Sequence, residues 1–188
     1  MFYLIVIFIA MLLIIGANLL FAATFTLEVI LNMAFSVTVA TVAIFLIDAV
    51  SALAIRRLTP QKWYLPEKML FTVSKKERNF YNKLKIKAWK DKVPELGGFT
   101  SFHKDHLESQ SDVKYLEKFL IESNYGVIIH FANGILGVFI LFIPFCNMPS
   151  VWVPVFVVNL ILSLMPVAIL RHTSYTLLRL YQRSLKKD

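Results

Sequence analysis

A histidine inside an apolar stretch is the residue of this chain best placed to do chemistry. His130 lies about one and a half turns after Tyr125, where a long apolar run begins. An ionisable side chain in lipid is costly unless it is paired or functional, so His130 is a candidate site residue by position alone. An imidazole oriented by a carboxylate can act as a general base on a hydroxyl. The other ionisable candidates at or near the ends of apolar runs are Asp48, Glu122, Arg171 and His172.

These side chains are expected at one membrane depth. Asp48 lies about two turns before the end of its apolar run, and His130 lies about as far inside the next one. With a rise of about 1.5 Å per residue, the candidates fall in roughly one layer near the inner headgroups. There His130 is the predicted general base, and Asp48 or Glu122 would orient it. A nearby arginine such as Arg171 would hold a phosphate or carboxylate, or stabilise developing negative charge.

Each candidate also has a purely structural explanation. His130 would be hydrogen-bonded to a neighbour, and Asp48 would pair with Arg56 or Arg171. Arg171 and His172 would be interfacial anchors, and Glu122 would be a solvated helix residue. Two amides inside the later apolar runs, Asn133 and Asn159, are expected to bridge helices rather than to touch substrate.

The composition predicts a polytopic membrane protein. The chain has 188 residues, of which 57% are hydrophobic, more than a soluble domain usually has. Of its 20 Lys and Arg residues, 15 lie between Arg56 and Lys118, and the other five lie between Arg171 and Lys187. The single cysteine, Cys146, excludes a disulfide framework and a thiolate metal site, and we expect no metal.

The predicted fold is all-α, with four transmembrane helices and a basic amphipathic region between the second and the third. The basic residues place that region and both termini in the cytoplasm. The predicted divisions are a hairpin of spans over 1–55, a cytoplasmic or interfacial helical cap over 56–122, and a second hairpin with a basic tail over 123–188. The expected spans are about 2–24, 29–55, 125–145 and 151–170.

The central region is expected to form helices at the membrane surface. Ser74 and Glu77 fit a capping box, and the helix that follows runs to about Val93, where Pro94 and Gly97-Gly98 stop it. Ser111 would cap a second helix over 112–123. The region carries 15 basic and 9 acidic side chains, so it is attracted to anionic headgroups. No nucleic-acid motif accompanies this charge, and nucleic acid is not an expected partner.

Other motifs give weaker signals. His103-Lys104-Asp105-His106 lies in a polar loop, and short motifs of this kind match by chance. A peptidase using Cys146 with His130 is excluded, because the two residues lie near opposite ends of one span. The sequence contains no Gly-x-Ser-x-Gly, P-loop or His-Glu-x-x-His motif.

Three segments carry a resemblance to a known family. They are Phe80 to Glu95 (FYNKLKIKAWKDKVPE), Ile121-Glu122-Ser123 followed by Ile129-His130-Phe131, and Met165-Pro166 followed by Arg171. Together they resemble the glycosyl-4,4'-diaponeurosporenoate acyltransferases. Those membrane enzymes complete staphyloxanthin-type carotenoid biosynthesis by esterifying the sugar of a carotenoid glycoside with a fatty acyl group. The resemblance covers the chain from about Trp63 to its end.

This resemblance implies a membrane acyltransferase that acts on a lipid-linked glycoside, either a carotenoid glycoside or another glycolipid. It implies a general base at His130, assisted by Glu122, and substrate contacts from Trp89, Lys90, Arg171 and His172. No bound cofactor is expected. An acyl-CoA or acyl-carrier thioester would be the co-substrate, and the expected partners are membrane lipids, the glycoside and the fatty acyl donor. The sequence leaves the oligomeric state open.

Two departures from the family pattern support an alternative function. Val127 stands where the family typically has a second glutamate, three residues before the histidine. Arg171-His172-Thr173-Ser174-Tyr175 stands where the family has an Arg-Tyr-Asn-Arg-like motif. The alternative is a non-catalytic membrane subunit or lipid-binding protein derived from such enzymes.

Overall fold

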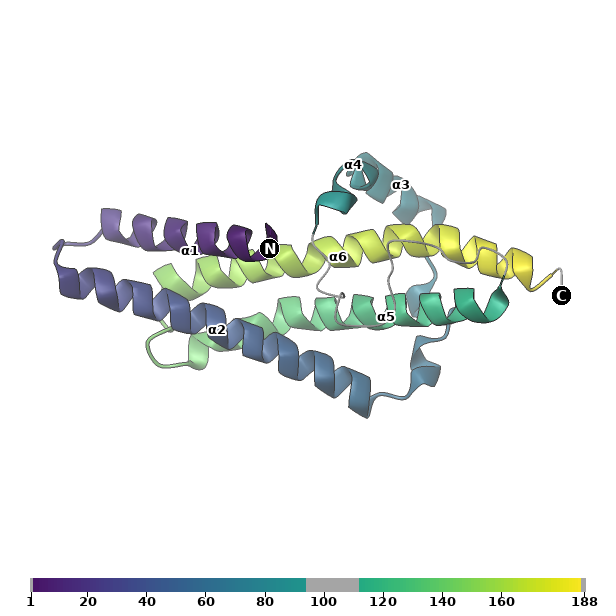
Figure 1. Cartoon of the computed structure of the whole chain (residues 1–188), viewed down its shortest axis with the longest axis horizontal. Coiled ribbons are helices and arrows are strands. Elements are labelled where there is room, and N and C mark those ends of the chain that lie inside the picture. The colour runs from purple at the N-terminus through teal and green to yellow at the C-terminus, as the bar shows by residue number, and fades with distance from the viewer. Residues whose placement is uncertain (1, 94–111, 187–188) are drawn as a thin grey trace. The chain divides into compact units, whose positions relative to one another are not determined.

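The structure, a computed structural model, describes residues 2–93 and 112–186, and within them all regular structure is helical (Figure 1). Three helical segments are long and apolar enough to cross a membrane: Leu27–Leu58, Val113–Phe142 and Pro149–Ser184. A shorter apolar helix covers Leu4–Leu20. The predicted all-helical class is therefore confirmed for the described residues, and the three long segments indicate a membrane protein.

Six α-helices form the described part of the chain, joined by short 3-10 segments. The α-helices are α1 (Phe2–Leu20), α2 (Leu27–Leu58), α3 (Lys75–Lys83), α4 (Ile86–Trp89), α5 (Val113–Leu136) and α6 (Pro149–Ser184). The 3-10 segments are η1 (Gln61–Tyr64), η2 (Met69–Phe71), η3 (Lys90–Lys92) and η5 (Gly137–Phe142).

Charged and polar residues set several helix ends. Helix α2 has Glu28 in its first turn and Arg56 and Arg57 in its last, which complements the helix dipole at both ends. At the start of α5, the Oδ1 atom of Asp112 accepts hydrogen bonds from the backbone N–H groups of Lys114 and Tyr115. Ser111, the predicted cap, lies outside the described residues.

Two predicted helices continue further than expected. The predicted helix over 112–123 and the following span form one helix, α5, since no proline separates them. Helix α6 continues beyond Leu170 to Ser184. Its last turns are held in place because Leu177 and Tyr181 are buried against α5. Apolar packing therefore extends both helices beyond their most apolar stretches.

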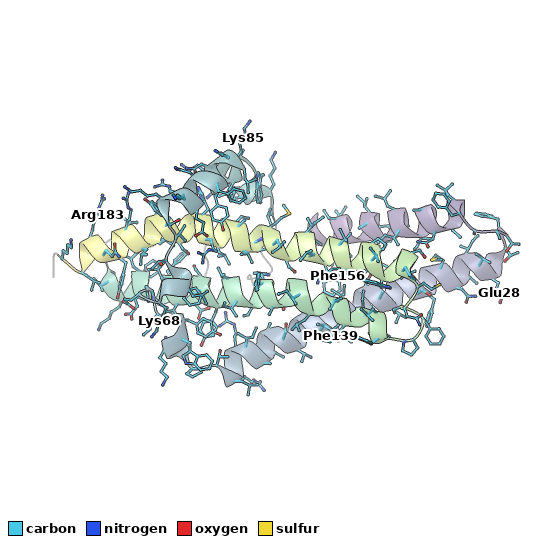
Figure 2. The ribbon with its side chains drawn as sticks, turned by 180° about the vertical axis from the view of Figure 1, so that it is seen from behind. Glu28, Lys68, Lys85, Phe139, Phe156 and Arg183 are labelled. Carbon is cyan, nitrogen blue, oxygen red and sulfur yellow. The ribbon has the colours of Figure 1, made fainter. Side chains whose placement is uncertain are left out.

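The predicted helix from Ser74 to Val93 is broken at Lys85. This residue adopts a left-handed conformation, with φ 52°, which is unfavourable for a residue with a side chain. The indole Nε1 of Trp89 donates a hydrogen bond of 3.0 Å to the carbonyl of Leu84, satisfying a group that the broken helix leaves without its regular partner. Lys85 lies at the resulting turn between α3 and α4 (Figure 2).

The chain forms two compact units, each assembled from two stretches of sequence. Unit 1 comprises Met1–Leu53 and Phe131–Leu164. Its core joins α1, α2, η5 and α6 through these buried side chains: Ile14, Val37, Ala40, Ile44, Ile140, Cys146, Val151 and Val155. By sequence, Glu28 and Asp48 are the only Asp, Glu, Lys or Arg residues in these ranges, so unit 1 suits a lipid environment.

Polar side chains bridge helices inside unit 1, as predicted for its two amides. Asn159 donates through Nδ2 to the backbone carbonyl of Asn133 at 3.0 Å, and the Ser51 hydroxyl donates to the side-chain oxygen of Asn133. Asn18 donates to the Ser150 carbonyl at 2.9 Å, which ties α1 to the start of α6. Such bonds help to join helices where water is scarce.

Unit 2 comprises Ala54–His130 and Met165–Asp188. Its sequence ranges contain every Lys and Arg of the chain. One part of its core packs α5 against α6 through Leu116, Phe119, Leu120, Leu177 and Tyr181. Ile86 of α4 is also fully buried. Apolar and basic sequence thus separate into different compact units.

Candidate functional site

The structure assigns most of the predicted site residues to one unit. Asp48 belongs to unit 1. The other six belong to unit 2: Glu122, His130, Trp89, Lys90, Arg171 and His172. They fall in two groups, and His130 has a separate position on α5.

The first group surrounds Glu122. A terminal nitrogen of Arg56, Nη2, lies 2.8 Å from Glu122 Oε2, and the two side chains are 42% and 24% exposed. The guanidinium of Arg56 also lies over the ring of Tyr125, at 5.4 Å from its centroid. Tyr125 stacks on Tyr64, with ring centroids 3.7 Å apart. Glu122 is therefore one end of an ordered chain of contacts and not an isolated solvated carboxylate.

The connection after α2 is fastened to α5 behind this group. The buried Tyr64 shares a hydrogen bond of 2.8 Å between its hydroxyl and that of Thr59. The side-chain amide of Asn124 donates to the backbone carbonyl of Tyr64 at 2.8 Å. Phe71 stacks on Tyr64 from η2. These contacts hold η1 against α5 and so fix Arg56 beside Glu122.

An open polar groove of about 560 Å³ lies at this group. This volume is within the range of small-ligand sites. The groove is lined by the end of α2, by η1 and the residue that follows it, and by the first half of α5: Arg56, Gln61, Leu65, Lys114, Glu117, Lys118, Ile121, Glu122 and Tyr125.

The second group is organised by Arg171 of α6. Its guanidinium binds both carboxylate oxygens of Glu77, at 2.5 Å through Nε and 2.9 Å through Nη2. It also donates to the backbone carbonyls of Leu70 at 2.9 Å and Thr72 at 3.5 Å. Arg171 therefore fastens η2 and the start of α3 to α6.

Glu77 explains why the capping box is only half formed. The Ser74 hydroxyl accepts a hydrogen bond of 3.1 Å from the backbone N–H of Glu77, as predicted. The Glu77 carboxylate does not complete the box but binds Arg171 and accepts a hydrogen bond of 2.9 Å from the Tyr81 hydroxyl. The hydrogen bond from Arg171 is the main reason that the pKa of Glu77 is below its ordinary value of 4.5.

The remaining predicted binding residues are His172 on α6, Trp89 at the end of α4 and Lys90 directly after it. His172 is buried, and its Nε2 lies 3.2 Å from Asn82 Oδ1. The indole N–H of Trp89 is used within the fold, on Leu84. Lys90 forms a weak surface ion pair with Asp91, with 3.6 Å between Nζ and Oδ1. The Lys90 side chain is 40% exposed and so is accessible to a ligand headgroup, whereas His172 is buried.

His130 and Asp48 are not part of either group. His130 is half-buried on α5 and lies eight residues after Glu122, which is roughly 12 Å along the helix axis. Asp48 lines a small cavity of about 40 Å³ in unit 1, together with Thr41, Asn159 and apolar side chains. Its buried Oδ1 has no hydrogen-bond partner among the residues that the structure describes.

The structural explanation that pairs Asp48 with Arg56 or Arg171 stays a prediction. Within unit 2 these arginines bind Glu122 and Glu77. Tyr64 and Asn82 were not identified, since nothing in their local sequence signals a distant polar partner. Tyr81 was not identified either, although its partner Glu77 lies only four residues before it. Glu77 was identified only as a capping residue.

Part of the predicted site region lies outside the described residues, namely Pro94, Glu95, Gly97-Gly98 and the segment His103–His106. Over residues 2–93 and 112–186, no group of three or more His, Cys, Asp or Glu residues is arranged to hold a metal ion.

The fold and its polar groups define a helical membrane protein whose basic unit carries a ligand-sized groove. The chain matches the glycosyl-4,4'-diaponeurosporenoate acyltransferase family, CrtO, over residues 60–183, and it belongs to that family. The resemblance predicted from the sequence motifs is thereby confirmed. The matched range includes Glu122 and His130 and excludes Asp48. No curated protein and no solved structure matches the chain.

Proposed function

We propose that this protein is a membrane acyltransferase that esterifies a sugar hydroxyl of a lipid-linked glycoside with a fatty acyl group. The observation that carries the proposal is the family match over residues 60–183. The name of that family points to a glycosylated carotenoid carboxylate as acceptor, and the proposal also covers other glycolipids. The position of His130 on an apolar helix supports the proposed acyltransferase activity. Placing an imidazole in lipid costs free energy, so an imidazole found there is expected to have a function.

In the proposed reaction His130 is the general base. It takes the proton of the sugar hydroxyl while that oxygen attacks the carbonyl carbon of an acyl-CoA or acyl-carrier thioester. The new C–O bond forms, the tetrahedral intermediate collapses, and the C–S bond breaks. The leaving thiolate then takes the proton from the imidazolium. No bound cofactor is needed for these steps.

The other candidates receive different roles. Because Glu122 is paired with Arg56, we assign it the positioning of that arginine. Lys90 and His172 remain proposed substrate contacts with Trp89, whereas the hydrogen bonds of Arg171 favour a positioning role. Asp48 remains a catalytic candidate because its buried oxygen lacks a described partner.

We also propose four spans, with both termini and the central region on the cytoplasmic side of a bacterial plasma membrane. Helix α1 has 19 residues, so it is about 28 Å long and close to the thickness of the hydrocarbon core. Helix α3 would lie at the interface. The exposed side chains of Phe80 in α3 and of Leu84, the residue that follows α3, would enter the lipid. The lysines of α3 would face the headgroups.

Acyl transfer by His130→Ala and His130→Gln tests the catalytic proposal. The purified protein in lipid nanodiscs is given a carotenoid glycoside and an acyl-CoA, and the ester is measured by mass spectrometry. We expect a loss of about 100-fold or more, as for removal of a general base. Thr38→Val is the control, because the Thr38 hydroxyl binds the Ala34 carbonyl of its own helix and no other described residue. Unchanged ester formation in folded His130→Ala protein would remove the proposed base.

Absence of ester formation by the unaltered protein, with glycolipid still copurifying, would favour the non-catalytic alternative. That alternative is supported by the use of Arg171 within the fold. The residue is one of the few from the family motif near Pro166 that this chain retains.

The topology is tested by cysteine labelling. Cys146 is the only cysteine, so a Cys146→Ala background permits single cysteines to be placed at will. A membrane-impermeant maleimide applied to intact cells should label Glu28→Cys and not Lys85→Cys. Labelling of both after the membrane is opened shows that each site is reactive, and the reverse pattern in intact cells would overturn the orientation.

A further inference from the structure

The groove beside Glu122 has a charge pattern that suits one class of ligand. Its lining contains three cations, Arg56, Lys114 and Lys118, and two carboxylates, Glu117 and Glu122. Arg56 and Glu122 bind each other. The other three charged residues of the lining lie in the first two turns of α5: Lys114, Glu117 and Lys118. Two of the three cations lie at helix ends. Arg56 lies in the last turn of α2, and Lys114 lies in the first turn of α5.

The two lysines are placed to act on one ligand group. Lys114 and Lys118 are four residues apart on α5, so their Cβ atoms are about 6 Å apart on one face. Lys114 is exposed, and both side chains border the groove. Two ammonium groups at this spacing suit a phosphate, which offers several acceptor oxygens to donors on the same side.

Arg56 adds a third, oriented donor group. Its single hydrogen bond within the described residues is from Nη2 to Glu122, and its guanidinium is held over Tyr125. The ion pair and the ring fix the plane of the guanidinium without using its other N–H groups. A guanidinium fixed in this way is suited to bind a phosphate through two parallel hydrogen bonds.

The lining does not favour a sugar in the same place. Sugar rings commonly pack on an aromatic face, and among the described residues that line the groove Tyr125 alone is aromatic. Its ring is already stacked on Tyr64 at 3.7 Å and contacted by Arg56. The groove therefore offers charged donors and no open aromatic platform.

We propose that the groove formed by Arg56, Lys114 and Lys118 binds the phosphate of a ligand at the membrane surface. Two sources share this chemistry: the phosphates of a thioester acyl donor and the phosphodiester of an anionic lipid headgroup. The inference deepens the proposed function, on which it rests for the acyl donor. Phosphate binding itself is measured without acyl transfer.

Binding by the full chain in an uncharged detergent tests the proposal. The probes are coenzyme A and dihexanoyl phosphatidylglycerol, each titrated by calorimetry at low salt. The groove variant is Lys114→Gln with Lys118→Gln. The control is Lys68→Gln with Lys186→Gln, which removes the same charge from exposed positions that lie outside both the groove and α3. We expect about tenfold weaker binding in the groove variant and less than a twofold change in the control.

Each outcome of these titrations either supports or overturns the proposed phosphate site. Binding of coenzyme A that the groove variant weakens assigns the site to the acyl donor, and the same result with the phosphatidylglycerol assigns it to a lipid headgroup. Failure of both probes to bind at about 1 mM, or equal weakening in both variants, overturns the proposal. If the double variant does not fold, Lys114→Gln alone serves, because this side chain is exposed.

The proposed function and this site fail separately. His130→Ala should retain phosphate binding, because His130 is not part of the groove lining. Loss of acyl transfer with binding retained leaves the groove proposal intact. Normal acyl transfer with no phosphate binding leaves the acyltransferase proposal intact and removes the groove proposal.

Discussion

The ion pair between Arg171 and Glu77 makes a prediction about stability that separates structural from ligand-binding roles. Glu77→Gln removes the negative charge while keeping the size of the side chain. The Arg171 and Glu77 side chains are only 17% and 26% exposed, and both carboxylate oxygens are bound. A hydrogen bond to a charged group contributes roughly 1.5–3 kcal/mol. Because glutamine retains one acceptor, we expect a loss of about 2 kcal/mol.

The assay is thermal unfolding in detergent, followed by size-exclusion signal or intrinsic fluorescence. For a chain of this length, a loss of about 2 kcal/mol corresponds to a Tm lower by roughly 4–8 °C. Asp91→Asn is the matched control, because it removes an ion pair on the surface with 3.6 Å between the charged atoms and an 82% exposed carboxylate. Such pairs contribute about 0–1 kcal/mol.

A double-mutant cycle with Arg171→Ala isolates the pair. Arg171→Ala should cost more than Glu77→Gln, because it also releases the carbonyls of Leu70 and Thr72. We expect a coupling energy of about 1–2 kcal/mol, typical of directly bonded partners. If Glu77→Gln lowers the Tm no more than Asp91→Asn does, Arg171 does not fasten α3 to α6. Its predicted role as a substrate contact would then regain support.

Two further predictions concern pH and packing. The pKa of Glu77 is lowered, mainly by the hydrogen bond from Arg171, so the stabilisation is complete above the ordinary pKa of 4.5 and is lost as the pH falls through the lowered value. The Tm difference between the unaltered protein and Glu77→Gln should therefore shrink below about pH 4, and a difference that stays constant from neutral pH to about pH 3 would contradict this. Gly137→Ala should lower the Tm by several degrees, since an added Cβ would lie 2.5 Å from Asn159 Nδ2 and overpacking costs about 1–3 kcal/mol. Gly16→Ala, where an added Cβ meets nothing within 4 Å, should leave the Tm equal or higher, because alanine favours a helix more than glycine does. Equal losses in both variants would contradict the assignment of the Gly137→Ala loss to close packing against Asn159.

The sequence predicted which segments form apolar helices better than it predicted where those helices begin and end. The apolar runs around Val37 and Val155 identified membrane-type helices. The break at Lys85 and the extension of α6 to Ser184 were not predicted. The extension of α6 depends on partners distant in the chain. Leu177 and Tyr181 extend α6 because they are buried against α5, and helix propensity alone does not encode such packing.

The site shows the same division. Glu122 and His130 were identified because an acidic residue at the end of an apolar run and an imidazole inside it are unusual in any membrane protein. Their partners were not. The sequence could not tell that Arg56 binds Glu122, 66 positions away, or that Arg171 binds Glu77, 94 positions away.

The order of residues alone determined that this chain is helical, enters a membrane and belongs to an acyltransferase family, because composition, charge distribution and local motifs are properties of short segments. Only the tertiary structure decided which arginine neutralises which glutamate and that a polar groove opens between the end of α2 and the start of α5. An ion pair or a groove exists only after segments far apart in sequence have packed together, and the free energy of that packing is spread over residues that show no local signal.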